Sequence, residues 1–172
     1  MSIEKSSTQD SSKRFLLLYF FWLLILFAIF YWGSYWSASK VGYYIDYYQR
    51  DFIMQILDSL LDNKIVNYDI IINPKYHVVI TPECNGLVPY FIFLAGVLAY
   101  RCTLFKKLLW LLGGYIIFSL INLIRLYAVV EIVNRFGSKY FFIAHDIGGN
   151  LLLVATGAIC FLIYLKSCKD EI

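Results

Sequence analysis

Three side chains in this sequence could together carry out acyl transfer: Cys84, Arg125 and His145. A cysteine thiolate is a strong nucleophile, histidine exchanges protons near neutral pH, and arginine stabilises negative charge that develops on a carbonyl oxygen. The three residues are far apart along the chain. The chemistry therefore depends on structural elements that bring them together.

Cys84 lies in a Pro-Glu-Cys-Asn-Gly segment just before a predicted helix. The unpaired N–H groups and the dipole at a helix N-terminus favour a thiolate, whereas the neighbouring carboxylate of Glu83 disfavours one. A reactive thiol is one interpretation of this cysteine. The alternative is a small packed residue without reactivity.

Arg125 interrupts an apolar segment, and placing an arginine in hydrocarbon is costly unless it is paired or hydrated. Asn122, three residues earlier, lies on the same helical face and can orient the guanidinium. A functional pocket is the favoured interpretation. The alternative is a structural ion pair with Glu131 or Asp146.

The chain has two histidines. His145 directly precedes the last apolar segment, and we expect it on the same side of the membrane as Cys84. His77 lies in a segment predicted to form a hairpin, where a solvated side chain is expected. His145 is therefore the candidate proton carrier.

The composition predicts a membrane protein. Of 172 residues, 60% are hydrophobic, 19% aromatic and 16% charged, whereas soluble domains are about 45–50% apolar and about 25% charged. One small core could not hide this much apolar surface, which excludes a soluble monomer. The net charge of +3 does not indicate nucleic-acid binding, because the basic residues flank apolar segments.

Four apolar segments predict an all-α integral membrane protein with about four transmembrane helices, at residues 15–36, 87–100, 108–133 and 148–165. The first is too long for a signal peptide, whose apolar region needs only about 7–15 residues. The second is short and contains Pro89. Its helix is expected to begin below the membrane surface or to continue to Phe105.

The distribution of Lys and Arg predicts the orientation, because cytoplasmic connections are enriched in them. Eight lie on the side of both termini: Lys5, Lys13, Arg14, Arg101, Lys106, Lys107, Lys166 and Lys169. Six lie on the other side: Lys40, Arg50, Lys64, Lys75, Arg135 and Lys139. Both termini are therefore expected in the cytoplasm. Cys84 is then the one exoplasmic cysteine, with Cys102 and Cys168 at the cytoplasmic face and Cys160 inside the last span.

The long exoplasmic connection has its own predicted structure. Apolar residues recur at helical spacing on one face, against the membrane or the bundle: Ile45, Tyr48, Phe52, Ile56 and Leu60. Residues 65–72 and 76–81 predict two strands joined by a turn at Asn73-Pro74-Lys75. The chain thus divides into a disordered tail (1–12), a first transmembrane helix (13–36), an exoplasmic loop (37–83), a membrane core of three helices (84–165) and a cytoplasmic tail (166–172).

The segments Glu83-Cys84-Asn85-Gly86 and Asn122-Leu123-Ile124-Arg125, followed by His145, resemble the exosortase/archaeosortase family in its compact bacterial subtype. The resemblance covers about residues 76–165. It implies a multi-pass protein of the bacterial inner or plasma membrane with an exoplasmic active site and no metal or other cofactor.

The resemblance also implies an activity. Substrates would be secreted proteins with a C-terminal recognition motif, a transmembrane helix and a basic tail. Cys84 would form a thioester, His145 would transfer protons and Arg125 would stabilise the oxyanion. Asn122, Asn85 and Gly86 would bind substrate or orient these groups.

Other classes of protein fit less well. A thiol-redox protein would need a second exoplasmic cysteine, and a transporter would show broken helices in two matching halves. A noncatalytic assembly or scaffold subunit of a surface polysaccharide or protein export system is the remaining alternative. Such a subunit would tolerate loss of the thiol.

The predicted orientation can be tested by labelling. In intact cells a membrane-impermeant maleimide should label Cys84 and leave Cys102 and Cys168 unmodified until the membrane is permeabilised. Labelling of the latter two in sealed cells would invert the orientation.

Overall fold

The computed structural model describes residues 2–36 and 40–169. Five helices form most of it: α1 (Ser2–Trp36), α2 (Lys40–Leu60), α3 (Leu87–Ala99), α4 (Leu104–Phe136) and α5 (Asn150–Lys169). Between α2 and α3 lies a small sheet of β1 (Ile65–Val66), β2 (Asp69–Asn73) and β3 (Tyr76–Val79). A 3₁₀ turn, Pro82–Asn85, precedes α3, and a π-helical segment, Ile143–Gly149, precedes α5.

The expected membrane architecture is confirmed. Three helical stretches are long and apolar enough to span a bilayer: Ser12–Ile29, Leu104–Phe136 and Ser138–Lys169. The 13 residues of α3 are apolar but reach only about 20 Å of the roughly 30 Å hydrocarbon core. The idea that this helix continues to Phe105 is wrong, because the chain is extended at Tyr100. Pro89 lies in the first turn of α3, where no N–H partner is lost.

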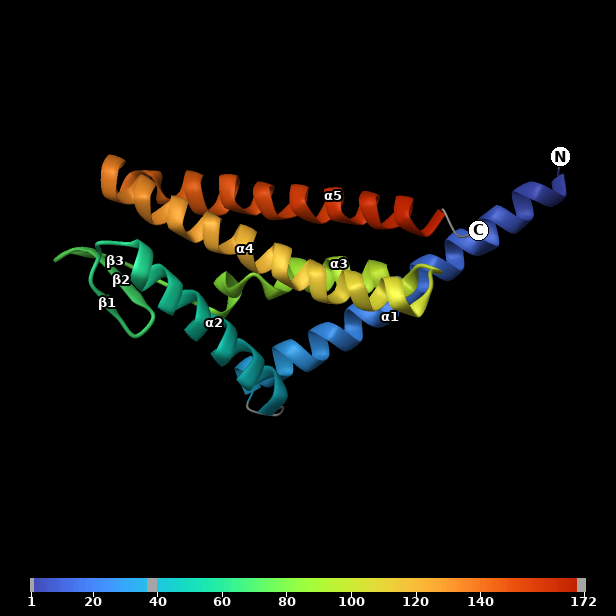
Figure 1. The fold of residues 1–172 in the computed structure, drawn as a ribbon, viewed down its shortest axis with the longest axis horizontal. Coiled ribbons are helices and arrows are strands. Elements are labelled where there is room, and N and C mark those ends of the chain that lie inside the picture. The colour runs from blue at the N-terminus through green and yellow to red at the C-terminus, as the bar shows by residue number, and fades with distance from the viewer. Residues whose placement is uncertain (1, 37–39, 170–172) are drawn as a thin grey trace.

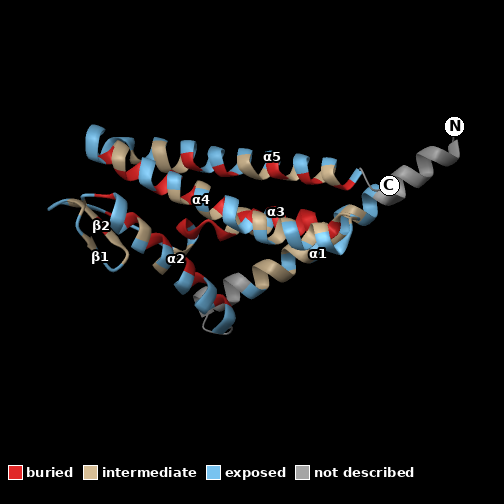
Figure 2. Cartoon of the chain, viewed as in Figure 1, coloured by how far each residue is buried: buried red, intermediate tan, exposed pale blue. Residues whose placement is uncertain are grey.

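The helices pack into a bundle with both chain ends on one side and the sheet on the other (Figure 1). α4 and α5 run side by side, and α3 packs against both as well as against α1. Aromatic side chains fill the centre of the bundle, with Tyr90, Phe93, Phe118 and Tyr164 all buried. Outward faces carry exposed apolar residues along α4 and α5 (Figure 2), as expected for helices solvated by lipid.

The sheet lies on α2 and the far end of α4. Its strand order is β1-β2-β3, with antiparallel pairs. The predicted β2–β3 hairpin is present, and the side chain of Asn73 accepts a hydrogen bond from the N–H of Lys75 in its turn (2.9 Å). The prediction of one strand over residues 65–72 is wrong. The chain turns at Asn67, whose φ of 56° is left-handed, and two strands result.

For the predicted apolar face of α2, expected against the membrane or the bundle, the structure excludes the bundle. The helix buries Asp46, Gln49, Ile53 and Leu57, while Tyr48 and Phe52 are 66% and 54% exposed. This helix has apolar residues on two faces. The face whose polar groups find hydrogen-bond partners packs against the bundle. The tyrosine-rich face remains open to the membrane interface.

Two further differences concern the ends of the chain. Residues 2–12, expected to be disordered, continue α1, because extending an existing helix is easier than starting one. Of the predicted C-terminal tail, residues 166–169 belong to α5, and residues 170–172 lie outside the described part.

Cys102 and Cys168, expected as separate thiols, form a disulfide with a Cα–Cα distance of 5.5 Å. The bond ties the connection between α3 and α4 to the end of α5. Disulfides are rare in reducing compartments. Maleimide labelling therefore tests both the pairing and the orientation. If Cys102 and Cys168 are paired, they react only after a reductant is added. If they lie in the cytoplasm, they also require permeabilisation of the membrane.

Candidate active site

Cys84 is held by the turn that connects the sheet to α3. Thr81 is extended, and its carbonyl accepts the N–H of Cys84 at 2.9 Å. Gly86 then adopts a left-handed φ of 79°. A Cβ at Gly86 would also lie 2.8 Å from the Cβ of Asn122. Glycine is thus required for both the backbone conformation and the close approach of α4, and Cys84 is left 7% exposed.

Asn122 and Arg125 extend from α4 toward this turn. The Asn122 side chain donates to the Cys84 carbonyl (2.8 Å) and accepts from Nη1 of Arg125 (3.3 Å). Nη2 of Arg125 lies 3.1 Å from Nε2 of His145 and 3.3 Å from Oδ1 of Asn150. The alternative ion pair with Glu131 is absent from these contacts of Arg125, because Glu131 pairs with Arg135 instead (2.8 Å).

His145 comes from the π-helical segment before α5. Such segments often occur at functional sites because they redirect side chains. Its ring stacks on Phe141 with centroids 5.0 Å apart and 8° between the planes. Gly149, one turn further, faces Arg125, and a Cβ there would lie 2.3 Å from Nε. A small residue at this position gives the guanidinium its space.

The hydrogen bonds of His145 indicate which nitrogen carries a proton. Nδ1 lies 3.3 Å from Oδ1 of Asp146, so it donates to the carboxylate. Nε2 faces the guanidinium of Arg125, which can only donate. Nε2 is therefore the unprotonated nitrogen, whose electron pair accepts from Arg125, and it lies 3.6 Å from Sγ of Cys84.

The Cys84 thiol is also contacted by Oγ1 of Thr81 at 3.5 Å. Burial raises the pKa of the thiol, but the hydrogen bonds to His145 and Thr81 outweigh it and leave the pKa below its ordinary value. Glu83 is exposed to solvent. The site thus stabilises the thiolate relative to that of an ordinary thiol, in spite of its apolar surroundings.

A pocket of about 190 Å³ opens beside Cys84 and His145. Its walls are mostly aliphatic: Val78, Val79, Ile80, Leu126, Val129 and Val130, with Thr81 and Phe141. His77 is exposed on β3 and does not line it. Within residues 2–36 and 40–169, no three His, Cys, Asp or Glu side chains gather as a metal site requires.

The structure thus brings Cys84, Arg125 and His145 together. The profile of the transmembrane exosortase family (Exosortase_EpsH) matches residues 11–163. The chain belongs to the transmembrane exosortase family. No curated protein and no solved structure gave a significant match.

Sequence reasoning missed a second group of polar residues in this exosortase. Asp46 and Gln49 of α2 are each 3% exposed. Asp46 accepts from the Asn85 side chain (2.8 Å) and pairs with Arg50 (2.6 Å). The sequence signal available for this group was the spacing of Asp46 and Gln49, which are three residues apart and share one face of a helix.

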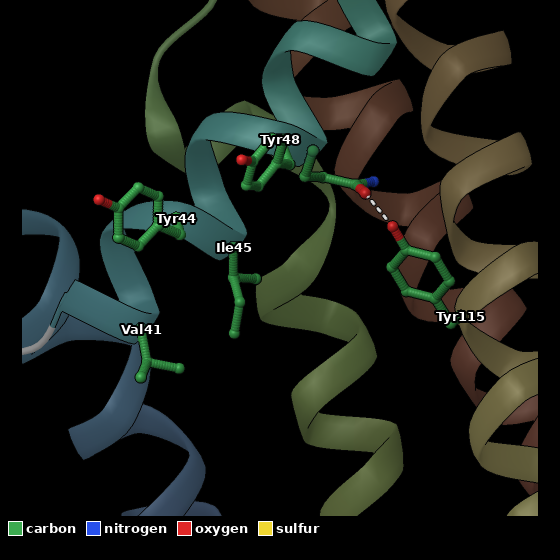
Figure 3. Close-up of a pocket in the computed structure, with 6 residues that line it drawn as sticks. Val41, Tyr44, Ile45, Tyr48 and Tyr115 are labelled. Carbon is green, nitrogen blue, oxygen red and sulfur yellow. Dashed lines mark hydrogen bonds between the residues drawn. The ribbon is translucent and has the colours of Figure 1, made fainter.

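Gln49 joins α2 to α4. It donates to Oγ of Ser119 (3.1 Å) and accepts from the hydroxyl of Tyr115, the dashed line in Figure 3. This bond closes the inner wall of a cleft lined by the aromatic rings of Tyr44 and Tyr48.

Asn85 completes the connection to α3. It is fully buried, and its Oδ1 accepts from the N–H of Leu87 (2.8 Å). With its other hydrogen bonds made to α2, Asn85 orients the turn that carries Cys84.

The lowered thiol pKa gives a measurable reactivity. We expect the rate of Cys84 alkylation by iodoacetamide to reach half its maximum at a pH below that of an ordinary thiol, because the thiolate persists to lower pH. His145→Ala should move this midpoint upward, since a lowering contact is removed. Mass spectrometry of the Cys84 adduct against pH gives both values.

A midpoint at Cys84 that is unchanged by His145→Ala would show that the histidine does not act on the thiol.

Proposed function

We propose that this exosortase is a membrane cysteine protease or transpeptidase that cleaves C-terminal sorting signals of secreted proteins through a thioester. The observation that carries the proposal is the 3.6 Å approach of Nε2 of His145 to Sγ of Cys84, with Arg125 beside both. These are the nucleophile, proton carrier and charge stabiliser that acyl transfer needs.

The reaction would proceed in two steps. Nε2 of His145 accepts the thiol proton, and the thiolate attacks the scissile carbonyl. Negative charge then develops on the carbonyl oxygen, where the Arg125 guanidinium can stabilise it in a low-dielectric site. The tetrahedral species collapses to a thioester as the leaving amine takes the proton from His145. Water, an amine or a lipid group then attacks the thioester and releases Cys84.

The architecture supports a substrate that is itself anchored in the membrane. Cys84 lies beyond the end of α3 that points away from both chain termini (Figure 1). With the termini in the cytoplasm, the site is at the exoplasmic face of the bacterial inner or plasma membrane. A substrate helix with a basic cytoplasmic end would present the motif preceding it to this face.

Arg125→Lys tests the charge stabiliser. Lysine keeps the charge but lacks the planar set of donors that contacts Asn122, His145 and Asn150. We expect cleavage to fall by about 10²-fold or more while the protein still inserts and accumulates. The measurement is processing, on immunoblots, of a secreted reporter that carries a tripartite tail encoded in the same genome.

Arg135→Lys is the matched control, because that arginine is exposed and pairs with Glu131. It should process the reporter normally. Normal processing by Arg125→Lys would mean that a simple charge suffices. Degradation of the Arg125→Lys protein would favour a structural role for Arg125.

Substitution of Cys84 and His145 separates an enzyme from a scaffold. Cys84→Ala and His145→Ala should each leave the reporter uncleaved. The double variant should be hardly worse than either, because nucleophile and base act in one step. His77→Ala, on the exposed strand, should process almost normally.

A scaffold subunit would behave differently, since Cys84→Ala would then support normal processing. Failure of His77→Ala with activity in His145→Ala would reassign the base. Mass spectrometry of trapped wild-type protein should find an acyl adduct on Cys84.

A further inference from the structure

The free edge of the small sheet faces the candidate site. The strand order places β3 at the edge of the described sheet, and β3 leads through Thr81 directly to Cys84. An edge strand presents unpaired N–H and C=O groups that can bind another extended chain. The groups of β3 that are not bonded to β2 are available for such binding.

The hydrogen-bond register between β2 and β3 shows which main-chain groups of β3 face the free edge. The N–H of Ile80 donates to the carbonyl of Tyr68 (2.8 Å), so Ile80 directs its main chain toward β2. Directions alternate along a strand. Val78, opposite Ile70, therefore also faces β2, whereas Val79 directs its N–H and C=O to the free edge.

The pocket beside Cys84 lies along that edge. Four consecutive residues, 78–81, line it. Side chains in an extended segment alternate between two faces, so these residues can share one pocket only along the backbone edge. Leu126, Val129 and Phe141 form the facing wall.

The direction of the edge fits the position of the nucleophile. Thr81 continues the extended conformation (φ −81°, ψ 168°), and its hydroxyl lies 3.5 Å from Sγ of Cys84. A chain bound along Val79 would therefore pass the thiol. The side chain next to the reacting carbonyl would enter an aliphatic space of about 190 Å³.

We infer that the substrate segment carrying the scissile bond binds as an added strand on β3, with hydrogen bonds to the main chain of Val79 and an aliphatic side chain in the adjoining pocket. This inference rests on the proposed function and names the conformation of its substrate. In strand addition, main-chain hydrogen bonds provide the affinity, and pockets for alternate side chains provide the specificity.

A peptide chloromethyl ketone tests this without a known substrate. The probe is an acetylated tripeptide of alanine, valine and valine that ends in the ketone. The thiolate of Cys84 displaces chloride and forms a thioether, so the adduct can be counted by mass spectrometry. Three further probes carry a single N-methyl group on one of the three amides in turn.

We expect N-methylation to slow labelling about 3- to 10-fold at the one amide whose N–H donates to the carbonyl of Val79, as for one lost hydrogen bond, and to have little effect at the adjacent amide, which points away from β3. Val79→Pro should slow the unmodified probe by a similar factor. Proline removes an N–H that is not used within the sheet, and edge strands tolerate it. Val79→Ala also shortens the side chain but keeps that N–H, so the difference in labelling rate between Val79→Pro and Val79→Ala measures the contribution of the N–H.

The pocket is tested with a fifth probe, in which aspartate replaces the final valine of the unmodified peptide. An aliphatic pocket should reject the carboxylate, so labelling should be at least 10-fold slower. Equal labelling rates for the valine and aspartate probes would overturn the assignment of the pocket.

Iodoacetamide separates the two proposals, since it needs the thiolate but no peptide site. Equal iodoacetamide rates in wild type, Val79→Pro and Val79→Ala show that the thiol is intact. If all N-methyl probes then react alike, strand addition is wrong and the proposed chemistry stands. A Cys84 thiol no more reactive than an ordinary one would instead contradict the proposed function. Should Val79→Pro fail to accumulate, the N-methyl series on wild-type protein decides.

Discussion

The site depends on one buried guanidinium. Arg125 is 5% exposed within an apolar bundle, where removing a charge from water is costly unless its donors find partners. Three side chains from different segments meet this demand: Asn122, His145 and Asn150. Satisfying the arginine therefore fixes how α4, the π-helical segment and α5 approach one another. The same contacts place Nε2 of His145 near Cys84.

One donor of this arginine is unused. Among the described residues, Nε of Arg125 is buried without a hydrogen-bond partner, and such a group costs about 1–3 kcal/mol. Gly149 lies directly against it. Polar groups left unsatisfied in a well-packed structure often mark functional sites. Here the cost is compatible with a guanidinium held for chemistry more than for stability.

The sequence revealed the candidate reacting groups more readily than the framework around them. Arg125 and Asn122 could be identified because polar residues are rare in an apolar span, and the motifs around Cys84 led to the exosortase family, which is confirmed. The orientation of α2 could not be predicted because the helix is apolar on two faces. Asp46 and Gln49 become significant only when Asn85 and Ser119 lie opposite them. The pairing of Cys102 with Cys168 depends likewise on tertiary proximity.

Helix lengths explain why the site is accessible. α4 begins at Leu104, and Asn122 follows 18 residues later, about 27 Å along the helix axis. This distance is close to the full thickness of about 30 Å of the hydrocarbon core. The 13 residues of α3 cover about 20 Å of the same path, and the extended connection at residues 100–103 spans the remainder. Cys84 thus lies near the boundary away from the termini, where the sheet meets the bundle. In the proposed reaction an extended polypeptide would reach it from water, and the apolar walls would keep the dielectric constant low enough for Arg125 to act strongly on a developing charge.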